Sequence, residues 1–153
     1  MEGPTNYPVY SIALNNKNKP QDKIIVTHDG VFHCDEVTGY TILNKIYPNN
    51  SLIRSRNKDI INSGDIVLDV GFVYNAATNR FDHHQESCKE YFNDKGSKQV
   101  PLSSAGLIYK HYGLTFIKLL LKDYNFVYTE KQLQSIYNGF YYDFIESIDA
   151  NDN

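Results

Sequence analysis

The chain has 153 residues, of which 41% are hydrophobic and 22% charged, and its formal net charge is −3. This length and composition predict one globular domain with a sizeable core that needs no disulfide staples, and they exclude a disordered chain. The slightly acidic balance excludes a histone-like electrostatic binder of nucleic acid, and no apolar run reaches the roughly 18 residues of a membrane span.

The cysteines and the N-terminus indicate a reducing compartment. Cys34 and Cys88 lie far apart with no CxxC pair, so we expect free thiols that behave as small buried apolar groups. The N-terminal stretch has neither a signal-peptide apolar run nor an arginine, so we expect neither a secretory signal nor a transit peptide. We predict an N-terminal extension over residues 1–22, with an edge-strand pattern at 9–14, and a domain over 23–153.

Short strands alternate with helices through the first half of the domain. Residues 23–28 and 65–71 are continuous apolar runs, which are typical of strands buried on both faces of a parallel sheet. Residues 51–56 are predicted to form a further strand. Helical patterns cover 35–48, ended by Pro48, and 58–64.

The second half is predicted to be a hairpin followed by helices. The hairpin covers residues 72–84, and a helix then begins at Ser103 or Ser104 and closes at Gly113. Residues 114–124 continue in helical register, and a capping box at Thr129 and Gln132 opens the last helical stretch. This order predicts an α/β fold, a mostly parallel sheet with helices on its faces.

Metal-binding residue types gather at the predicted strand ends. Four of the five histidines fall in two short segments, 28–35 and 82–84. His28 ends the first strand, Asp69 ends the third, and Asp82-His83-His84 follows the hairpin. Carboxyl ends of parallel strands meet at one edge of the sheet, where ligands bind. Because imidazole and carboxylate ligands together favour divalent transition metals, the sequence predicts such a site there.

An acidic run near the end of the chain has a spacing of three residues. Its members are Asp143, Glu146, Asp149 and Asp152. This spacing places them on one helical face if the helix persists to the end. We interpret Asp143 and Glu146 as a solvated face.

The tripeptide Asp82-His83-His84 is the name-giving motif of the DHH phosphoesterase superfamily. More closely, five segments resemble the melanocyte-proliferating-gene (Myg) exonuclease family: THDGVFHCDE (27–36), DIVLDVG (65–71), RFDHHQ (80–85), LSSAGLIYKHYG (102–113) and FIESIDANDN (144–153). The resemblance implies a three-layer α/β/α DHH-type domain with two divalent metal ions, Mn²⁺ above all. It also implies hydrolysis of phosphodiesters, 3′-to-5′ exonuclease activity on RNA, and a nuclear or mitochondrial location.

The resemblance also implies roles for single residues. One metal would be held by His28, His33 and Asp69, and the other by Asp35, Asp69, His83 and Asp149, with Asp69 bridging and Asp152 as the alternative to Asp149. His84 would face the substrate phosphate as a positioning group or proton donor, and Asp82 would orient a neighbour. Many superfamily members have an aspartate four residues after the first histidine, whereas this chain has His33 five residues after it. Family members continue much further, so we expect a C-terminal substrate domain outside this chain.

Three other interpretations stay open. A small-molecule phosphoesterase or pyrophosphatase would use the same metals. A non-haem Fe(II) oxygenase is suggested by His33-x-Asp35 with a distant histidine, but its triad is expected on an all-β jelly roll. A metal-binding module without catalysis is the third. We interpret Ser103 and Ser104 as helix caps, and the basic segment of Arg54, Arg56 and Lys58 as a solvated strand end.

Overall fold

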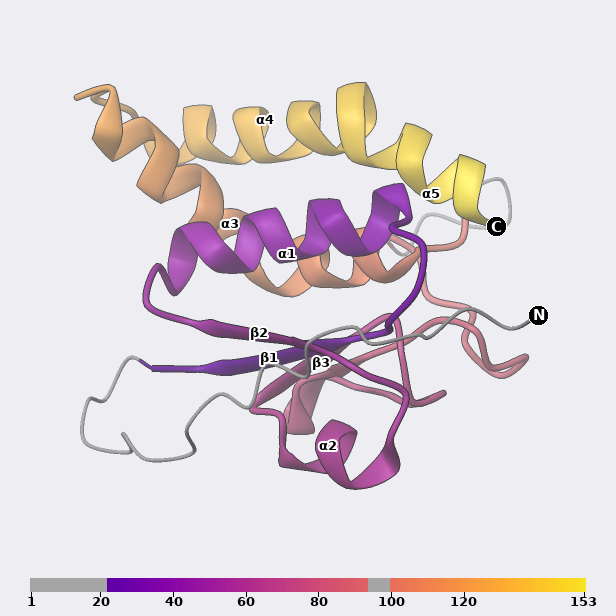
Figure 1. Ribbon diagram of the computed structural model, residues 1–153. Coiled ribbons are helices and arrows are strands. Elements are labelled where there is room, and N and C mark those ends of the chain that lie inside the picture. The colour runs from indigo at the N-terminus through magenta and orange to yellow at the C-terminus, as the bar shows by residue number, and fades with distance from the viewer. Residues whose placement is uncertain (1–21, 94–99) are drawn as a thin grey trace.

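The computed structural model describes residues 22–93 and 100–153 (Figure 1). The expected edge strand at 9–14, and all of the expected extension except residue 22, lie outside these ranges. In the described part, five strands form one sheet in the order β2-β1-β3-β5-β4. The parallel strands are β1 (Ile24–Thr27), β2 (Ser51–Arg54), β3 (Ile66–Leu68) and β5 (Arg80–Phe81), and β4 (Tyr74–Asn75) is the antiparallel edge.

Helices cover both faces of this sheet, so the fold is α/β with the predicted α/β/α layers (Figure 1). On one face lie α1 (Cys34–Ile46) and α3 (Ser104–Asp123), with α4 (Glu130–Phe140), the π-helical η2 (Tyr141–Ile145) and α5 (Glu146–Asp152) stacked on them. The other face carries α2 (Lys58–Ser63), and the short 3₁₀ turn η1 (Ala76–Thr78) joins the strands of the hairpin. Among the described residues, no helix combines the length and apolar character needed to cross a membrane.

The continuous apolar runs are explained by burial on both faces. Ile25 and Leu68 pack into the core beneath α1 and α3, whereas Val26 and Val67 pack with Ile61 of α2. Alternate side chains of a strand point to opposite faces, so a strand between two helical layers needs apolar residues throughout.

Two expectations about single residues were wrong. Gly113 does not close a helix, because α3 continues to Asp123. A Cβ at this position would lie 2.7 Å from a ring carbon of Tyr109, which is one turn earlier on the same helix. The glycine therefore leaves room for that ring to lie against the helix backbone. Cys34 is exposed, because α1 turns Asp35, Glu36 and Gly39 inward instead.

The strand order changes direction at β1, so the carboxyl end of this strand is a topological switch point. The chain leaves β1 for β2 on one side and returns to β3 on the other side of β1. Helix α1 follows β1 on one face of the sheet, and α2 precedes β3 on the other (Figure 1). Ligand sites of open α/β sheets lie at the carboxyl ends of strands at such a point. The ends of β1, β3 and β5 are therefore the expected position of the functional site.

Candidate metal centre

The ends of β1, β3 and β5 bring the predicted ligands together. His28 directly follows β1, Asp69 directly follows β3, and Asp82 directly follows β5. The start of α1 and the end of α5 close over the same place. The two helices contribute His33, Asp35, Glu36 and Asp152.

Asp69 lies at the centre of this cluster. Its Oδ2 is 3.2 Å from Nε2 of His28, whereas its Oδ1 is 3.7 Å from Nε2 of His83. Its backbone is left-handed, with φ of 55°, a conformation that costs a non-glycine residue roughly 1–3 kcal/mol. The Asp69 N–H donates to the carbonyl of Phe81, and Ser104 Oγ donates to Oδ1 at 3.2 Å. The surrounding chain thus holds one carboxylate so that Oδ2 faces His28 and Oδ1 faces His83 and His84.

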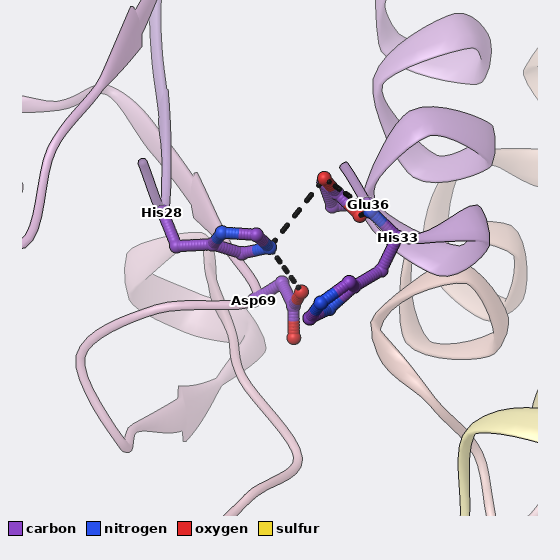
Figure 2. Close-up of side chains that lie close together, drawn as sticks. All are labelled: His28, His33, Glu36 and Asp69. Carbon is purple, nitrogen blue, oxygen red and sulfur yellow. Dashed lines mark hydrogen bonds and ion pairs between the residues drawn. The ribbon is translucent and has the colours of Figure 1, made fainter. Parts of the chain in front are cut away.

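The first group of possible ligands consists of His28, His33, Glu36 and Asp69 (Figure 2). Nδ1 of His28 lies 2.8 Å from the carbonyl oxygen of Asp29. Because a carbonyl only accepts, Nδ1 donates this hydrogen bond, and Nε2 on the other side of the ring faces Oδ2 of Asp69 and Oε1 of Glu36, the latter at 3.4 Å. The His33 ring lies beside His28, with ring centroids 4.9 Å apart. The ligand atoms of the four residues lie within 4.8 Å of one another.

The second group consists of Asp35, His83 and Asp152. Nε2 of His83 lies 2.9 Å from Oδ2 of Asp152 and 3.8 Å from Oδ2 of Asp35. Since Oδ1 of Asp69 also lies near this nitrogen, Asp69 joins the first group to the second.

Several buried ligand atoms of the two groups lack hydrogen-bond partners. Those atoms are His28 Nε2, both carboxylate oxygens of Asp35, Asp69 Oδ2 and His83 Nε2. Native proteins pair more than about 90% of buried polar groups, and an unpaired buried carboxylate costs several kcal/mol. Burial, reinforced by the charge of Asp35, raises the pKa of Asp69 to about 7. Burial and then the charge of Asp152 raise the pKa of Asp35. A divalent cation would give each of these atoms its missing partner, so the donor set fits metal ions.

His84 differs from the other histidines because its Nδ1 is already engaged. Oδ1 of Asp82 lies 2.7 Å from this nitrogen and also accepts the His84 backbone N–H. Burial by itself would lower the pKa of His84, but the hydrogen bond and charge of Asp82 raise it overall. The side chain of His84 is 48% exposed. Asp82 therefore orients an imidazole that is about half exposed to solvent.

Asp149 lies outside both groups. Its carboxylate accepts hydrogen bonds from the Ser103 N–H, Ser103 Oγ, the Gly106 N–H and the Tyr141 hydroxyl. A Cβ at Gly106 would lie 2.5 Å from the carboxylate oxygens, so only glycine leaves room for them. Burial raises the pKa of Asp149 to about 6, although the hydrogen bonds from Ser103 oppose that rise. The structure thus brings Asp152, and not Asp149, to His83.

The condition for a common face of the acidic run, one regular helix that persists to the end, is not met at Asp143. Asp143 is exposed, Asp149 is fully buried and Asp152 is partly buried. The wider π turn of η2 interrupts the regular spacing after Asp143.

Sequence reasoning missed Glu36. The backbone N–H of His33 donates to both of its carboxylate oxygens, at 2.8 and 2.7 Å, so Glu36 caps α1 from inside the cluster. A glutamate three residues after a helix N-cap is the capping-box signal that could have identified it.

The structure also places His33 and Asp35 in different groups, on an α/β fold. Both facts weaken the oxygenase interpretation.

The comparisons with known proteins agree on one family. The family model described as "Uncharacterised protein family (UPF0160)", named MYG1_exonuc, matches residues 24–153. The MYG1 protein of Dictyostelium discoideum is 43% identical over 134 residues, which are 86% of this chain and 39% of that protein. The MYG1 protein YER156C of Saccharomyces cerevisiae is 40% identical over 147 residues, which are 95% of this chain and 41% of that protein.

A human relative carries a functional name. The MYG1 exonuclease of Homo sapiens is 37% identical over 134 residues, 84% of this chain and 35% of that protein. No solved structure gives a significant match. The chain spans about two fifths of the length of the curated relatives it matches. With the family model covering nearly the whole described domain, the chain belongs to the MYG1 exonuclease family.

Proposed function

We propose that the protein is a metal-dependent nuclease that hydrolyses phosphodiester bonds, and that this part of the chain builds its two-metal centre. One observation carries the proposal: buried ligand atoms without partners surround Asp69 in two groups, and each group faces one of its oxygens. The name exonuclease, carried by the mammalian relatives, supports the reaction class.

In this proposal the two groups hold one metal each. His28, His33 and Asp69 hold the first, and Asp35, Asp69, His83 and Asp152 hold the second. Glu36 keeps the start of α1 in place beside them. The mixture of imidazole and carboxylate suits Mn²⁺. Divalent metals bound in such a pair supply a water nucleophile near neutral pH and neutralise the charge of the phosphate.

His84 acts on the substrate in this mechanism. Asp82 accepts a hydrogen bond from the Nδ1–H, so the imidazole keeps one orientation, with Nε2 on the side of the ring away from Asp82. The raised pKa of His84 favours the protonated form of its imidazole. The Nε2–H then donates to a phosphate oxygen or to the leaving oxygen. We propose single-stranded RNA as the substrate, degraded from its 3′ end.

The first test is the metal content of this chain, measured by elemental analysis after Mn²⁺ loading and desalting. We expect about two ions per chain in the wild type, one in His28→Ala and none in Asp69→Ala, because Asp69 is the one residue of the described ranges that faces both groups. Asp143→Ala is the matched control, since Asp143 is exposed. One ion in the wild type that persists in Asp69→Ala would contradict the bridged centre.

The second test is cleavage by the full-length protein. RNA labelled at its 5′ end should shorten stepwise in the presence of Mn²⁺, and Asp69→Ala should abolish this shortening. Unchanged cleavage by Asp69→Ala would refute the assigned site. Cleavage of pyrophosphate or small phosphoesters, but not of RNA, would favour the small-molecule phosphoesterase.

A further inference from the structure

Phe72 is an exposed aromatic side chain in a strained conformation beside the metal centre. It is 68% exposed, and its φ of 56° places a bulky residue in the left-handed region. Bulky residues are outliers there, and the conformation costs roughly 1–3 kcal/mol. Neither the strain nor the exposure of an apolar ring stabilises the fold. Strain of this kind clusters at ligand-binding positions, so the ring itself is a candidate for a binding role.

The buried carboxylate of Asp82 positions both Phe72 and His84. Its Oδ2 accepts the Phe72 backbone N–H at 2.7 Å, and its Oδ1 accepts the two hydrogen bonds from His84. The two rings lie edge to face, with centroids 6.2 Å apart and planes at 70°. Phe72 therefore has a fixed place relative to the imidazole proposed to contact the phosphate.

A second exposed ring at this end of the sheet is placed differently. Phe32 is 62% exposed, but the guanidinium of Arg54 lies over its ring, 3.6 Å from the centroid. Arg54 also donates to the carbonyl of Gly30, which holds this stack together. One face of Phe32 is thus already covered by a cation. Phe72 is the better candidate for a planar ligand.

We propose that Phe72 is the platform on which the base of the terminal nucleotide stacks while His84 contacts the adjoining phosphate. The inference rests on the proposed nuclease function and adds a substrate preference to it. One sugar joins a base to its phosphate, so a ring packed against His84, with centroids 6.2 Å apart, lies within reach of that base. Stacking accepts every base, because each has a π face. A single-stranded end can turn its terminal base onto the ring, whereas a paired base is held in the duplex by its partner, so the platform favours single-stranded ends.

The test uses the full-length, Mn²⁺-loaded protein and a short RNA with 2-aminopurine at its 3′-terminal position. The fluorescence of this base is quenched when it stacks, and stopped-flow mixing separates binding from later cleavage. The variants are Phe72→Ala, Phe72→Trp and Phe126→Ala. Phe126 is the matched control, since it is 51% exposed and lies in the connection between α3 and α4, away from the centre.

We expect quenching in the wild type, Phe72→Trp and Phe126→Ala, and none in Phe72→Ala. The Kd of Phe72→Ala should rise about fivefold to 150-fold, because base–aromatic stacking contributes roughly 1–3 kcal/mol. An RNA with an abasic 3′ terminus should bind the wild type and Phe72→Ala equally. This last comparison separates stacking from mere support of His84.

Three results would overturn the platform. The first is wild-type quenching in Phe72→Ala. The second is equal weakening of abasic and base-bearing RNA, which assigns Phe72 to positioning. The third is a large loss of thermal stability in full-length Phe72→Ala, which shows that the rest of the protein covers the ring. If the wild type cleaves no RNA, the nuclease proposal fails, and the quenching still decides whether a base stacks on Phe72.

Discussion

Asp149 and Asp152 are three residues apart on α5, yet their carboxylates have different partners. Asp152 lies 2.9 Å from Nε2 of His83, whereas Asp149 accepts hydrogen bonds from the first turn of α3 and from Tyr141. Asp149 thereby docks α5 against α3, and this docking carries Asp152 to the candidate metal centre. Asp149 supports the packing of two helices, whereas Asp152 faces the candidate ligand His83.

Replacing Asp149 should therefore destabilise the fold. In Asp149→Ala, buried donors of Ser103, Gly106 and Tyr141 lose their acceptor, and each hydrogen bond to a charged group contributes roughly 1.5–3 kcal/mol. We expect a loss of about 3 kcal/mol or more in the free energy of unfolding, measured by urea denaturation of the metal-free chain. The exposed Asp143→Ala should change it by less than about 0.5 kcal/mol. Equal effects of the two substitutions would contradict the docking role.

Replacing Asp152 should instead affect metal binding. Asp152→Asn removes a charge beside His83 while leaving the contacts of Asp149 intact. We expect about one bound Mn²⁺ per chain in place of two, with a urea midpoint in metal-free protein close to that of the wild type. Full metal occupancy in Asp152→Asn would show that another residue completes the second group.

Substitution by alanine at two glycines should change the free energy of unfolding in opposite directions. In Gly106→Ala, the new Cβ would lie 2.5 Å from the buried carboxylate of Asp149, so we expect a loss of several kcal/mol in unfolding free energy. Gly139 lies inside α4 with nothing within 4 Å of a Cβ, so Gly139→Ala should stabilise the chain by about 0.5–1 kcal/mol. Thermal unfolding of both variants checks the pair. A neutral Gly106→Ala would mean that α5 does not press against α3 as described.

The pKa of His84 should depend on Asp82. Because the hydrogen bond and charge of Asp82 offset the effect of burial, Asp82→Asn should lower the pKa of His84. An NMR titration of the imidazole protons in metal-free protein measures this change. His111 is an internal control, because its pKa is lowered by burial and by Lys110, and it pairs with Tyr74 instead. An unchanged pKa of His84 in Asp82→Asn would refute the role assigned to the Asp82–His84 hydrogen bond.

The pH dependence of stability should report on Asp69. Burial raises its pKa from 3.8 to about 7, so the folded chain binds more protons than the unfolded chain between these pH values. Its contribution to stability is therefore present below about pH 4 and lost as the pH rises to about 7. The unfolding free energy of metal-free wild type, minus that of Asp69→Asn, should fall across this window by on the order of 1–4 kcal/mol.

Urea denaturation at several pH values gives this difference. Excess Mn²⁺ at pH 7 should restore stability to the wild type more than to Asp69→Asn, because ligands that bind only the folded state stabilise it. A difference that rises with pH would mean that the carboxylate of Asp69 is stabilised by protein groups alone.

The local sequence pattern was sufficient to predict the strands of the sheet and the candidate ligands at their carboxyl ends. The apolar runs of β1 and β3 specify strands buried on both faces, and His28 and Asp69 follow them directly. Parallel strands aligned in one sheet must bring such residues to one edge. For these residues, position along the chain already determines position in space.

Tertiary packing alone decided the parts of the site that depend on distant partners. Asp149 and Asp152 look equivalent in sequence, and the choice between them depends on Ser103, which is 46 residues away from Asp149. Gly113 and Cys34 were misplaced for the same reason, because a neighbouring ring and the inward face of α1 decide their roles. A buried polar group adopts whichever arrangement pairs its hydrogen bonds, and those partners exist only once the helices are packed.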